Sequence, residues 1–154
     1  MSLAVYAPLS GTLTALGKVP DPVFAAQMVG SGVAVEPPPS AGPVDVVAPV
    51  AGTVATLHPH AFVIRTDSGA AVLVHLGIDT VRLKGEGFNA QVAAGEQVEV
   101  GRTVITFDPS AVRSRGMSAV CPVVVLDSRP GSARPPSVTG PVSAGALLFG
   151  WAAP

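Results

Sequence analysis

Apolar residues, most often valine, occur in short runs that are separated by turn residues along most of the chain. The runs recur at spacings of roughly eight to fifteen residues, which is typical of a β-sandwich or a β-barrel. The pattern therefore predicts a sheet protein built from many short strands. The clearest predicted strands are Val44–Val50, Thr53–Leu57, Ala61–Thr66, Ala70–Leu76, Gln97–Val100, Thr103–Phe107, Val120–Leu126 and Ala144–Phe149.

Short helices are predicted at two places, Pro22–Val29 and Pro109–Gly116, and each begins with a proline. Proline suits the first turn of a helix because its missing N–H would have no partner there. The sequence Asp67-Ser68-Gly69 is typical of a hairpin turn between two of the predicted strands. With 154 residues the chain has the length of one domain, so we expect a single all-β domain over residues 1–154.

A short sequence repeat links two distant parts of the chain. Ala7-Pro8-Leu9-Ser10-Gly11-Thr12 returns as Ala48-Pro49-Val50-Ala51-Gly52-Thr53, which predicts a duplicated, hammerhead-like β unit. Biotinyl and lipoyl carriers contain such units and attach their cofactor to a lysine at a hairpin tip. The two lysines here, Lys18 and Lys84, are not in that setting, so we expect no cofactor.

Composition narrows the possible functions. Glycine and proline account for 17 and 16 residues, 48% of the chain is hydrophobic and only 12% is charged. A disordered chain needs low hydrophobicity and a high net charge, whereas this chain has a mean hydropathy of +0.52 and a net charge of −1. Nine basic residues against ten acidic ones, without a basic cluster, exclude a typical nucleic-acid-binding face.

Two uncharged stretches, Met1–Gly17 and Pro135–Pro154, raise the question of membrane insertion. Proline and glycine interrupt both, so neither supplies the run of about 20 apolar residues that a spanning helix needs, and each predicts strands instead. The single cysteine, Cys121, excludes an intrachain disulfide and lies in an apolar run typical of a buried, inert thiol. We therefore expect a soluble, cytoplasmic chain without direct membrane insertion.

Three histidines, His58, His60 and His75, carry the candidate chemistry. Alternation along the predicted strand Ala70–Leu76 places His75 on the same face as Leu73, where a lone histidine is more often a core residue. If the predicted hairpin forms, His60 and His75 lie near its open ends and face each other. Two imidazoles that meet across strands make a ready site for a phosphate or a metal ion.

A long ordered series of motifs runs from about Ala7 to Phe149. It includes Met28-Val29-Gly30-Ser31-Gly32-Val33-Ala34 and His60-Ala61-Phe62, and its centre is Val74-His75-Leu76-Gly77-Ile78-Asp79-Thr80-Val81-Arg82-Leu83-Lys84-Gly85-Glu86-Gly87-Phe88. The series resembles the glucose-family enzyme IIA of the bacterial phosphoenolpyruvate:sugar phosphotransferase system. Its centre is a long and specific signature, unlike a lone short motif.

The resemblance implies a flattened antiparallel β-sandwich, in agreement with the strand pattern. It implies that His75 is the phosphorylated histidine, which accepts a phosphoryl group from HPr and passes it to a cysteine of a glucose- or N-acetylglucosamine-type enzyme IIB during sugar uptake. It also implies that His60 is the second histidine and stabilises the phosphoryl oxygens. The partners would be HPr and the enzyme IIB/IIC permease, and some relatives also regulate transporters or kinases.

The resemblance further implies a docking surface around the histidines. In the family, a ring-shaped patch of apolar side chains contacts both partners, and carboxylates at the edge of this patch form ion pairs with arginines of the partners. Without the resemblance, core packing would be the ordinary explanation for Phe24 and Met28, and a capping or solvent-exposed role would be the ordinary explanation for the aspartates. The predicted ring is Val23, Phe24, Met28, Val29 and Leu73, and the predicted rim acids are Asp21 and Asp79.

Several positions depart from the family's usual pattern. Ser31 stands where an acidic residue is common, and Ala26-Gln27 stands where a Glu-Lys pair is common. We expect both changes to remove charge from the docking surface. His58 stands where a threonine commonly supports the second histidine, so a third imidazole is expected in the site.

Two other functions fit part of the sequence. His58-x-His60 and His75-x-x-x-Asp79 have the spacing of zinc ligands in lysostaphin-like peptidases, but the two elements occur in the reverse order here. We expect no resident metal, although His60 and His75 could hold adventitious zinc or share it with a partner carboxylate. A purely regulatory binding module is the other alternative, and the presence of both histidines argues against it.

Overall fold

The structure, a computed structural model, describes residues 2–137 and 139–153, whereas Met1, Val138 and Pro154, within the two uncharged stretches, lie outside the described residues. No helix in the described part is long and apolar enough to cross a membrane. The helices are η1 (Leu16–Lys18), α1 (Pro22–Ala25), η2 (Thr80–Leu83) and α2 (Pro109–Ser114), where η denotes a 3₁₀ turn. The strands are β1 (Ser2–Tyr6), β2 (Gly11–Ala15), β3 (Gly30–Glu36), β4 (Val44–Val47), β5 (Gly52–His58), β6 (Ala61–Arg65), β7 (Ala71–His75), β8 (Phe88–Ala90), β9 (Gln97–Val98), β10 (Thr103–Phe107), β11 (Cys121–Leu126), β12 (Gly140–Val142) and β13 (Leu147–Ala152).

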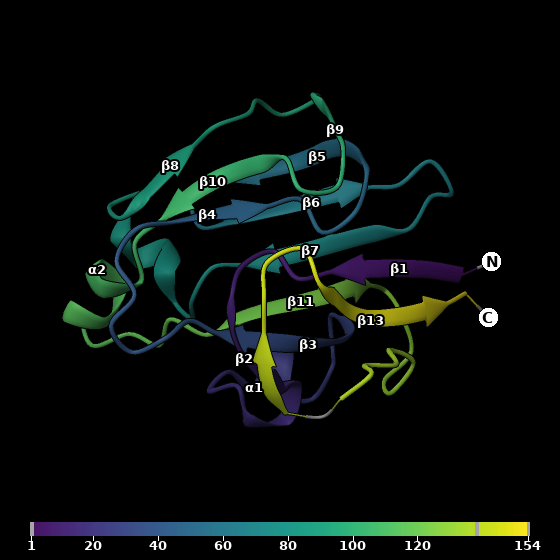
Figure 1. Ribbon diagram of the computed structural model, residues 1–154, viewed down its shortest axis with the longest axis horizontal. Coiled ribbons are helices and arrows are strands. Elements are labelled where there is room, and N and C mark those ends of the chain that lie inside the picture. The colour runs from purple at the N-terminus through teal and green to yellow at the C-terminus, as the bar shows by residue number, and fades with distance from the viewer. Residues whose placement is uncertain (1, 138, 154) are drawn as a thin grey trace.

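The strands form three sheets in which all neighbours run antiparallel. The largest sheet has the order β12-β2-β3-β11-β7-β6-β5-β9, and the smaller ones are β4-β10-β8 and β1-β13. Figure 1 shows β8, β10 and β4 on one side of the molecule and β3 and β11 on the other, with both chain ends beside the β1-β13 pair. The predicted antiparallel all-β fold with two short α-helices is confirmed.

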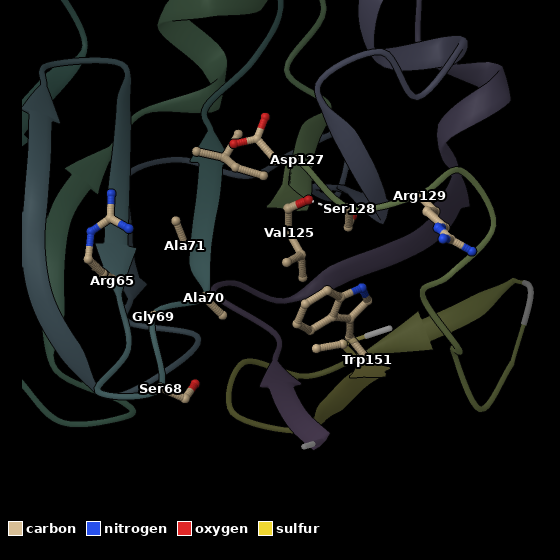
Figure 2. Close-up of a pocket in the computed structure, with 12 residues that line it drawn as sticks. Arg65, Ser68, Gly69, Ala70, Ala71, Val125, Asp127, Ser128, Arg129 and Trp151 are labelled. Atoms are coloured by element: carbon tan, nitrogen blue, oxygen red, sulfur yellow. Dashed lines mark hydrogen bonds between the residues drawn. The ribbon is translucent and has the colours of Figure 1, made fainter.

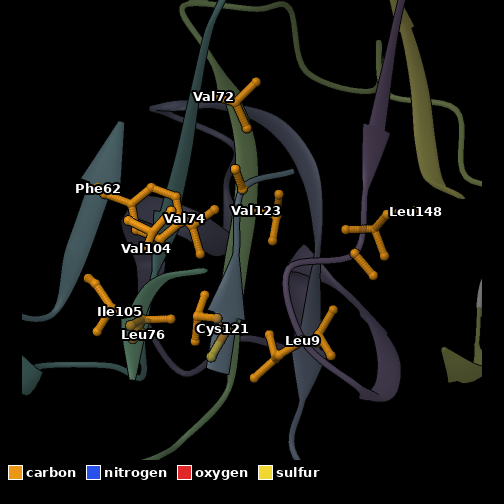
Figure 3. Close-up of a cluster of buried hydrophobic side chains, with 14 of the residues drawn as sticks. Leu9, Phe62, Val72, Val74, Leu76, Val104, Ile105, Cys121, Val123 and Leu148 are labelled. Atoms are coloured by element: carbon orange, nitrogen blue, oxygen red, sulfur yellow. The ribbon is translucent and has the colours of Figure 1, made fainter. Parts of the chain in front are cut away.

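Alternating side chains decide which face of each strand enters the core. In β7, Val72 and Val74 are fully buried in the main core, whereas Leu73 and His75 lie on the opposite face and are only half-buried. Strand β11 is buried on both faces because β3 and β7 flank it and apolar side chains cover each side. Figure 3 shows Val72, Val74 and Val123 within one cluster of core side chains.

The predicted inert cysteine lies in this core. Cys121 begins β11, is fully buried and forms no disulfide. Burial disfavours the charged thiolate and raises the pKa of the Cys121 thiol to about 12. The thiolate is the reactive form of cysteine, so the structure confirms a packing role for this residue.

A separate group of apolar side chains, here called the second cluster, packs on the face of β7 that carries His75. It places α1 against β3, β11 and the segment after β7, and it supports the area around the histidines. Its buried members are Leu16, Val19, Phe24, Ala34, Ile78, Val120 and Val124, with the partly buried Val29, Leu73 and Leu126 packed against them.

The two copies of the sequence repeat lie side by side and form equivalent contacts. The Tyr6 N–H donates to the Pro49 carbonyl at 2.9 Å, and the Val47 N–H donates to the Pro8 carbonyl at 2.8 Å. Each copy also bonds through its alanine to a turn elsewhere in the chain, so the repeat closes the sandwich at two related places. These bonds are Ala7 N–H to Ala146 O, Gly145 N–H to Ala7 O, Ala48 N–H to Arg102 O and Gly101 N–H to Ala48 O.

Several element boundaries differ from the predictions. Helix α1 ends at Ala25 rather than at the predicted Val29. The cause is Gln27, which adopts a left-handed conformation with φ of 56°. The Met28 N–H then donates a hydrogen bond to the Val23 carbonyl, which is a Schellman-type helix ending. Strand β9 covers only the first half of the predicted Gln97–Val100, and β13 begins later than the predicted Ala144. Strands β3 and β8 were not predicted as strands, because glycines that resemble turn signals lie within or beside them.

The equivalent glycines of the repeat, Gly11 and Gly52, should be sensitive to a single added methyl group. A Cβ would lie 2.2 Å from the Glu36 carbonyl oxygen at Gly11 and 2.2 Å from the Arg65 carbonyl oxygen at Gly52. We expect Gly11→Ala and Gly52→Ala each to lower the free energy of unfolding by about 1–3 kcal/mol because neighbouring backbone must move. Urea unfolding measures this change.

Gly42 provides the matched control for these variants, because a Cβ there meets no atom within 4 Å. Gly42→Ala should change the free energy of unfolding by less than about 0.5 kcal/mol. Equal stability of the Gly11→Ala and Gly42→Ala proteins would contradict the packing explanation.

Candidate functional site

The β6-β7 hairpin brings His60 and His75 together as the sequence predicted. Ala61 pairs with His75 in the ladder, and the Leu76 N–H donates to the His60 carbonyl at 2.8 Å. The two imidazole centroids are 5.2 Å apart, and the ring planes meet at 71°. The residues therefore form one site at the open end of the hairpin.

A hydrogen bond to the main chain determines the tautomer of His75. Its Nδ1 lies 2.6 Å from the Gly77 carbonyl oxygen. A carbonyl oxygen only accepts hydrogen bonds, so Nδ1 carries the proton and Nε2 keeps its lone pair. The backbone acceptor that the sequence could not identify is thus two residues further along the chain.

The Gly77 carbonyl is available to His75 because the chain turns sharply after β7. Gly77 has a φ of 78°, a region that favours glycine, and a Cβ there would lie 2.7 Å from Thr80 Cγ2 and 2.8 Å from the Ser118 carbonyl oxygen. The turn is also held by hydrogen bonds on both sides. The Thr80 hydroxyl donates to the Leu76 carbonyl at 2.8 Å, and the Ile78 N–H donates to the Ser118 carbonyl at 3.0 Å.

Helix α1 supplies the other support of the His75 ring. Phe24 is only 7% exposed, and its ring centroid lies 5.4 Å from that of His75 at an interplanar angle of 60°. Asp21 caps the helix, since its Oδ1 accepts hydrogen bonds from the N–H groups of Val23 at 2.9 Å and Phe24 at 3.3 Å. The structure thus places Phe24 behind the imidazole and gives Asp21 a capping contact.

The environment of His75 favours its neutral form. Burial lowers the pKa of His75 below its ordinary value of 6.5, and this effect exceeds the opposing effects of the Gly77 hydrogen bond and of Asp21 and Asp79. Asp79 is exposed and follows the turn in a left-handed conformation with φ of 62°. Both predicted rim acids therefore act on His75 through their charge.

His58 lies beside His60, so the site contains the expected third imidazole. His58 ends β5 and is exposed, and its ring stacks on that of His60 with 5.7 Å between centroids and 20° between planes. Burial lowers the pKa of His60, and positive charge on His75 or His58 lowers it further. His60 is therefore also held mainly neutral.

The predicted docking residues differ in exposure. Val23 and Met28 are 43% and 74% exposed, whereas Val29 and Leu73 are partly buried against the second cluster. Val81, at 62% exposed, is a further apolar side chain close to Asp79 in sequence. The sequence reasoning missed Val81 because the pattern did not reveal η2, although its apolar side chain between Thr80 and Arg82 was a signal.

The prediction that Ser31 removes charge from the docking surface was wrong, because Ser31 is buried at 2% exposure. The Ser31 hydroxyl accepts a hydrogen bond from the Ala133 N–H at 3.0 Å, so Ser31 holds the loop that contains Ala133 in place. Gln27 is half-buried and holds the same loop, since its Oε1 accepts a hydrogen bond from the Gly131 N–H at 2.7 Å. Ala26 is exposed beside them.

The geometry does not support the zinc peptidase. Within residues 2–137 and 139–153, no group of three or more histidine, cysteine or carboxylate side chains is arranged to hold a metal ion. Neutral His75 offers only a lone pair at Nε2, because its N–H is used by the Gly77 carbonyl, so the neighbouring His60 ring is the group that can donate a hydrogen bond to an oxyanion between the two rings.

Comparison with known proteins identifies the family. Residues 3–130 match the family model described as phosphoenolpyruvate-dependent sugar phosphotransferase system, EIIA 1. A glucose-specific EIIA component of Halalkalibacterium halodurans is 46% identical over 125 residues, which cover 80% of this chain and 70% of that protein. A glucose-specific EIIBCA component of Corynebacterium glutamicum is 43% identical over 126 residues, which cover 80% of this chain and 18% of that protein.

The solved structures give the same result for the fold. Glucose permease IIA from Mycoplasma capricolum aligns with a TM-score of 0.84 and 34% sequence identity, and the alignment covers 97% of this chain and 96% of that one. This alignment covers more of the chain than residues 3–130. The chain belongs to the EIIA 1 family of the phosphoenolpyruvate-dependent sugar phosphotransferase system.

Proposed function

We propose that His75 is the phosphorylated residue of this EIIA component. It accepts a phosphoryl group from HPr and passes the group to a cysteine of a glucose- or N-acetylglucosamine-type enzyme IIB. EIIA components are relay proteins between these two partners, and this one would act in the cytoplasm as a single domain. The observation that carries the proposal is the 2.6 Å contact between His75 Nδ1 and the Gly77 carbonyl, which leaves Nε2 available beside His60.

Loading begins with neutral His75. The lone pair of Nε2 attacks the phosphorus of phospho-HPr, a nitrogen–phosphorus bond forms at Nε2, and the nitrogen–phosphorus bond of the HPr histidine breaks. The proton stays bonded to Nδ1 throughout and remains hydrogen-bonded to the Gly77 carbonyl oxygen. Because phosphoryl transfer has a loose transition state, the protein contributes mainly position and charge stabilisation.

The same hydrogen bond prepares the second transfer. A phosphorylated ring that keeps its Nδ1 proton carries positive charge, which the Gly77 carbonyl, Asp21 and Asp79 stabilise. When a cysteine thiolate attacks the phosphorus, the Nε2–phosphorus bond breaks and the ring leaves as neutral imidazole. A neutral leaving group departs easily, so one contact serves both loading and release.

His60 is the residue placed to stabilise the phosphoryl oxygens. Its ring meets that of His75 nearly at a right angle and is partly open to solvent. A bound phosphoryl group adds negative charge that favours a proton on His60, and this change opposes the effects that lower its pKa in the unphosphorylated protein. The ion pairs among the described residues join Arg102 to Glu96, Arg113 to Glu36 and Arg115 to Glu86, so none of them involves Asp21 or Asp79.

The exposed apolar side chains near the site suit brief contacts with two partners in turn. Val23, Met28 and Val81 are each more than 40% exposed, and Asp79 adds an exposed carboxylate. Partners that must be released use small interfaces, at the low end near 1,200 Å² or less. We propose this area as the shared docking surface for HPr and enzyme IIB, with Phe24, Val29 and Leu73 supporting it from below.

Phosphorylation of His75 is tested directly. Incubation with phosphoenolpyruvate, enzyme I and HPr should label the protein with a phosphoramidate that is stable to base and labile to acid. His75→Gln should reduce the label to background, whereas His58→Thr should keep it, because His58 is exposed and its ring stacks on His60. Undiminished labelling of the His75→Gln protein would refute the assignment.

His60 should matter more for onward transfer than for loading. Loss of one donor to a transition-state oxyanion slows a reaction by about 10²-fold, so we expect His60→Gln to slow transfer to enzyme IIB by about that factor. Loading from phospho-HPr should slow by less than about tenfold. Single-turnover measurements with each partner give the two rates, and equal slowing of both would contradict the assignment.

The pKa of His60 should respond to its stacked neighbour. His58→Thr removes an imidazole whose positive charge lowers the pKa of His60, so the midpoint of His60 should move upward, toward its ordinary value. A pH titration of the histidine side chains by NMR measures the midpoint in the unphosphorylated protein. His75 is the internal control, because burial, the Gly77 hydrogen bond and the charges of Asp21 and Asp79 determine the shift of its pKa. An unchanged His60 midpoint would contradict the coupling.

A further inference from the structure

A second concave feature lies at the end of β7 opposite to the histidines. It is a cleft of about 480 Å³ between the turn that joins β6 to β7 and the segment that follows β11. Ala71 is the first residue of β7 and His75 the last, so the cleft begins roughly 13 Å from His75 along the strand. The docking surface and the phosphoryl site do not account for it.

The lining of the cleft combines an aromatic ring with two cations. Trp151 of β13 is half-buried, and its Nε1–H donates to the Ser132 hydroxyl at 3.1 Å. Arg65 and Arg129 line the cleft on either side of the indole in Figure 2. Both arginines are exposed, so their guanidinium groups can turn toward a ligand, and neither belongs to the three ion pairs that the described residues form.

One wall of the cleft is held in place by hydrogen bonds from outside the cleft. The wall is the segment Leu126–Arg129, and the loop that continues from it is tied to Gln27 and to Ser31. Most small-molecule sites are largely formed before the ligand arrives, and this wall meets that condition. The bonds are Asp127 N–H to Val29 O at 3.0 Å, Ser31 N–H to Ser128 Oγ at 2.8 Å, Gly131 N–H to Gln27 Oε1 at 2.7 Å and Ala133 N–H to Ser31 Oγ at 3.0 Å.

The lining defines the chemistry of a ligand. An indole stacks on flat aromatic rings, and arginine binds phosphate or carboxylate through paired N–H groups. Asp127 is the one acidic residue among the lining residues, so the charge of the lining is positive. The volume of about 480 Å³ lies within the range of small-molecule sites, which is about 300–1,000 Å³.

We propose that this cleft binds a small molecule in which a flat aromatic ring is joined to a negatively charged group, as in a nucleoside monophosphate. The ring stacks on Trp151, and the anionic group lies between Arg65 and Arg129. The proposal is independent of phosphoryl transfer at His75, because none of these residues belongs to the histidine site.

The single tryptophan makes the test specific to the cleft. The chain contains one tryptophan, Trp151, so tryptophan fluorescence reports on this position alone. Titration with adenosine 5′-monophosphate should change the fluorescence in a saturable way. Adenosine lacks the anion and inorganic phosphate lacks the ring, so each should bind at least about tenfold more weakly, which is the effect of losing one strong interaction.

Variants locate the site. The double variant Arg65→Gln, Arg129→Gln should weaken the binding of adenosine 5′-monophosphate by at least about tenfold. Arg102→Gln is the matched control, because Arg102 is an exposed arginine that pairs with Glu96 outside the cleft, and it should leave the affinity unchanged. Thermal unfolding of each variant verifies that the fold is retained.

The outcomes separate the possibilities. Saturable binding that the Arg65→Gln, Arg129→Gln double variant weakens and that shifts the NMR amide signals of Ala70 and Ser128 supports the proposal. Absence of a saturable change, or equal affinity of the double variant and the parent protein, would overturn it. Equal binding of adenosine and adenosine 5′-monophosphate would also overturn it, since the arginines would then contribute nothing.

Discussion

The hydrogen bond between His75 and the Gly77 carbonyl is the contact on which the site depends. It holds the imidazole ring, determines which nitrogen carries the proton and leaves Nε2 with a free lone pair. The turn that presents the carbonyl requires a glycine, and it is tied on both sides by Thr80 and Ser118. A short turn after one strand therefore determines the chemistry of the whole site.

The surroundings of this bond serve two requirements that oppose each other. Burial keeps His75 neutral, whereas the charges of Asp21 and Asp79 favour its positively charged form. The second cluster supplies the burial because it packs α1 and Phe24 against the ring. Val23 within α1 and Met28 just after it remain exposed at the surface.

Differences between prediction and structure arise where contacts distant in sequence decide the outcome. Ser31 was expected to lack charge at an exposed position, but it is buried because the loop near Ala133 folds over it. Helix α1 ends early at Gln27, whose left-handed backbone is accompanied by a side-chain bond to Gly131. Strand β3 was missed because its glycines, which sequence rules associate with turns, allow close approach of the β11 carbonyls.

Hydrophobic alternation, turn residues and a long motif are local signals, so they were enough to predict the antiparallel all-β class, most strands, the hairpin that pairs His60 with His75, and the family. The three-dimensional structure was needed to show that Gly77 is the acceptor for His75, that His58 stacks on His60, and that Trp151 and Arg65 line one cleft. These relations depend on side-chain direction and on the packing of segments far apart in the chain. Neither property is encoded in the spacing of residues along one strand.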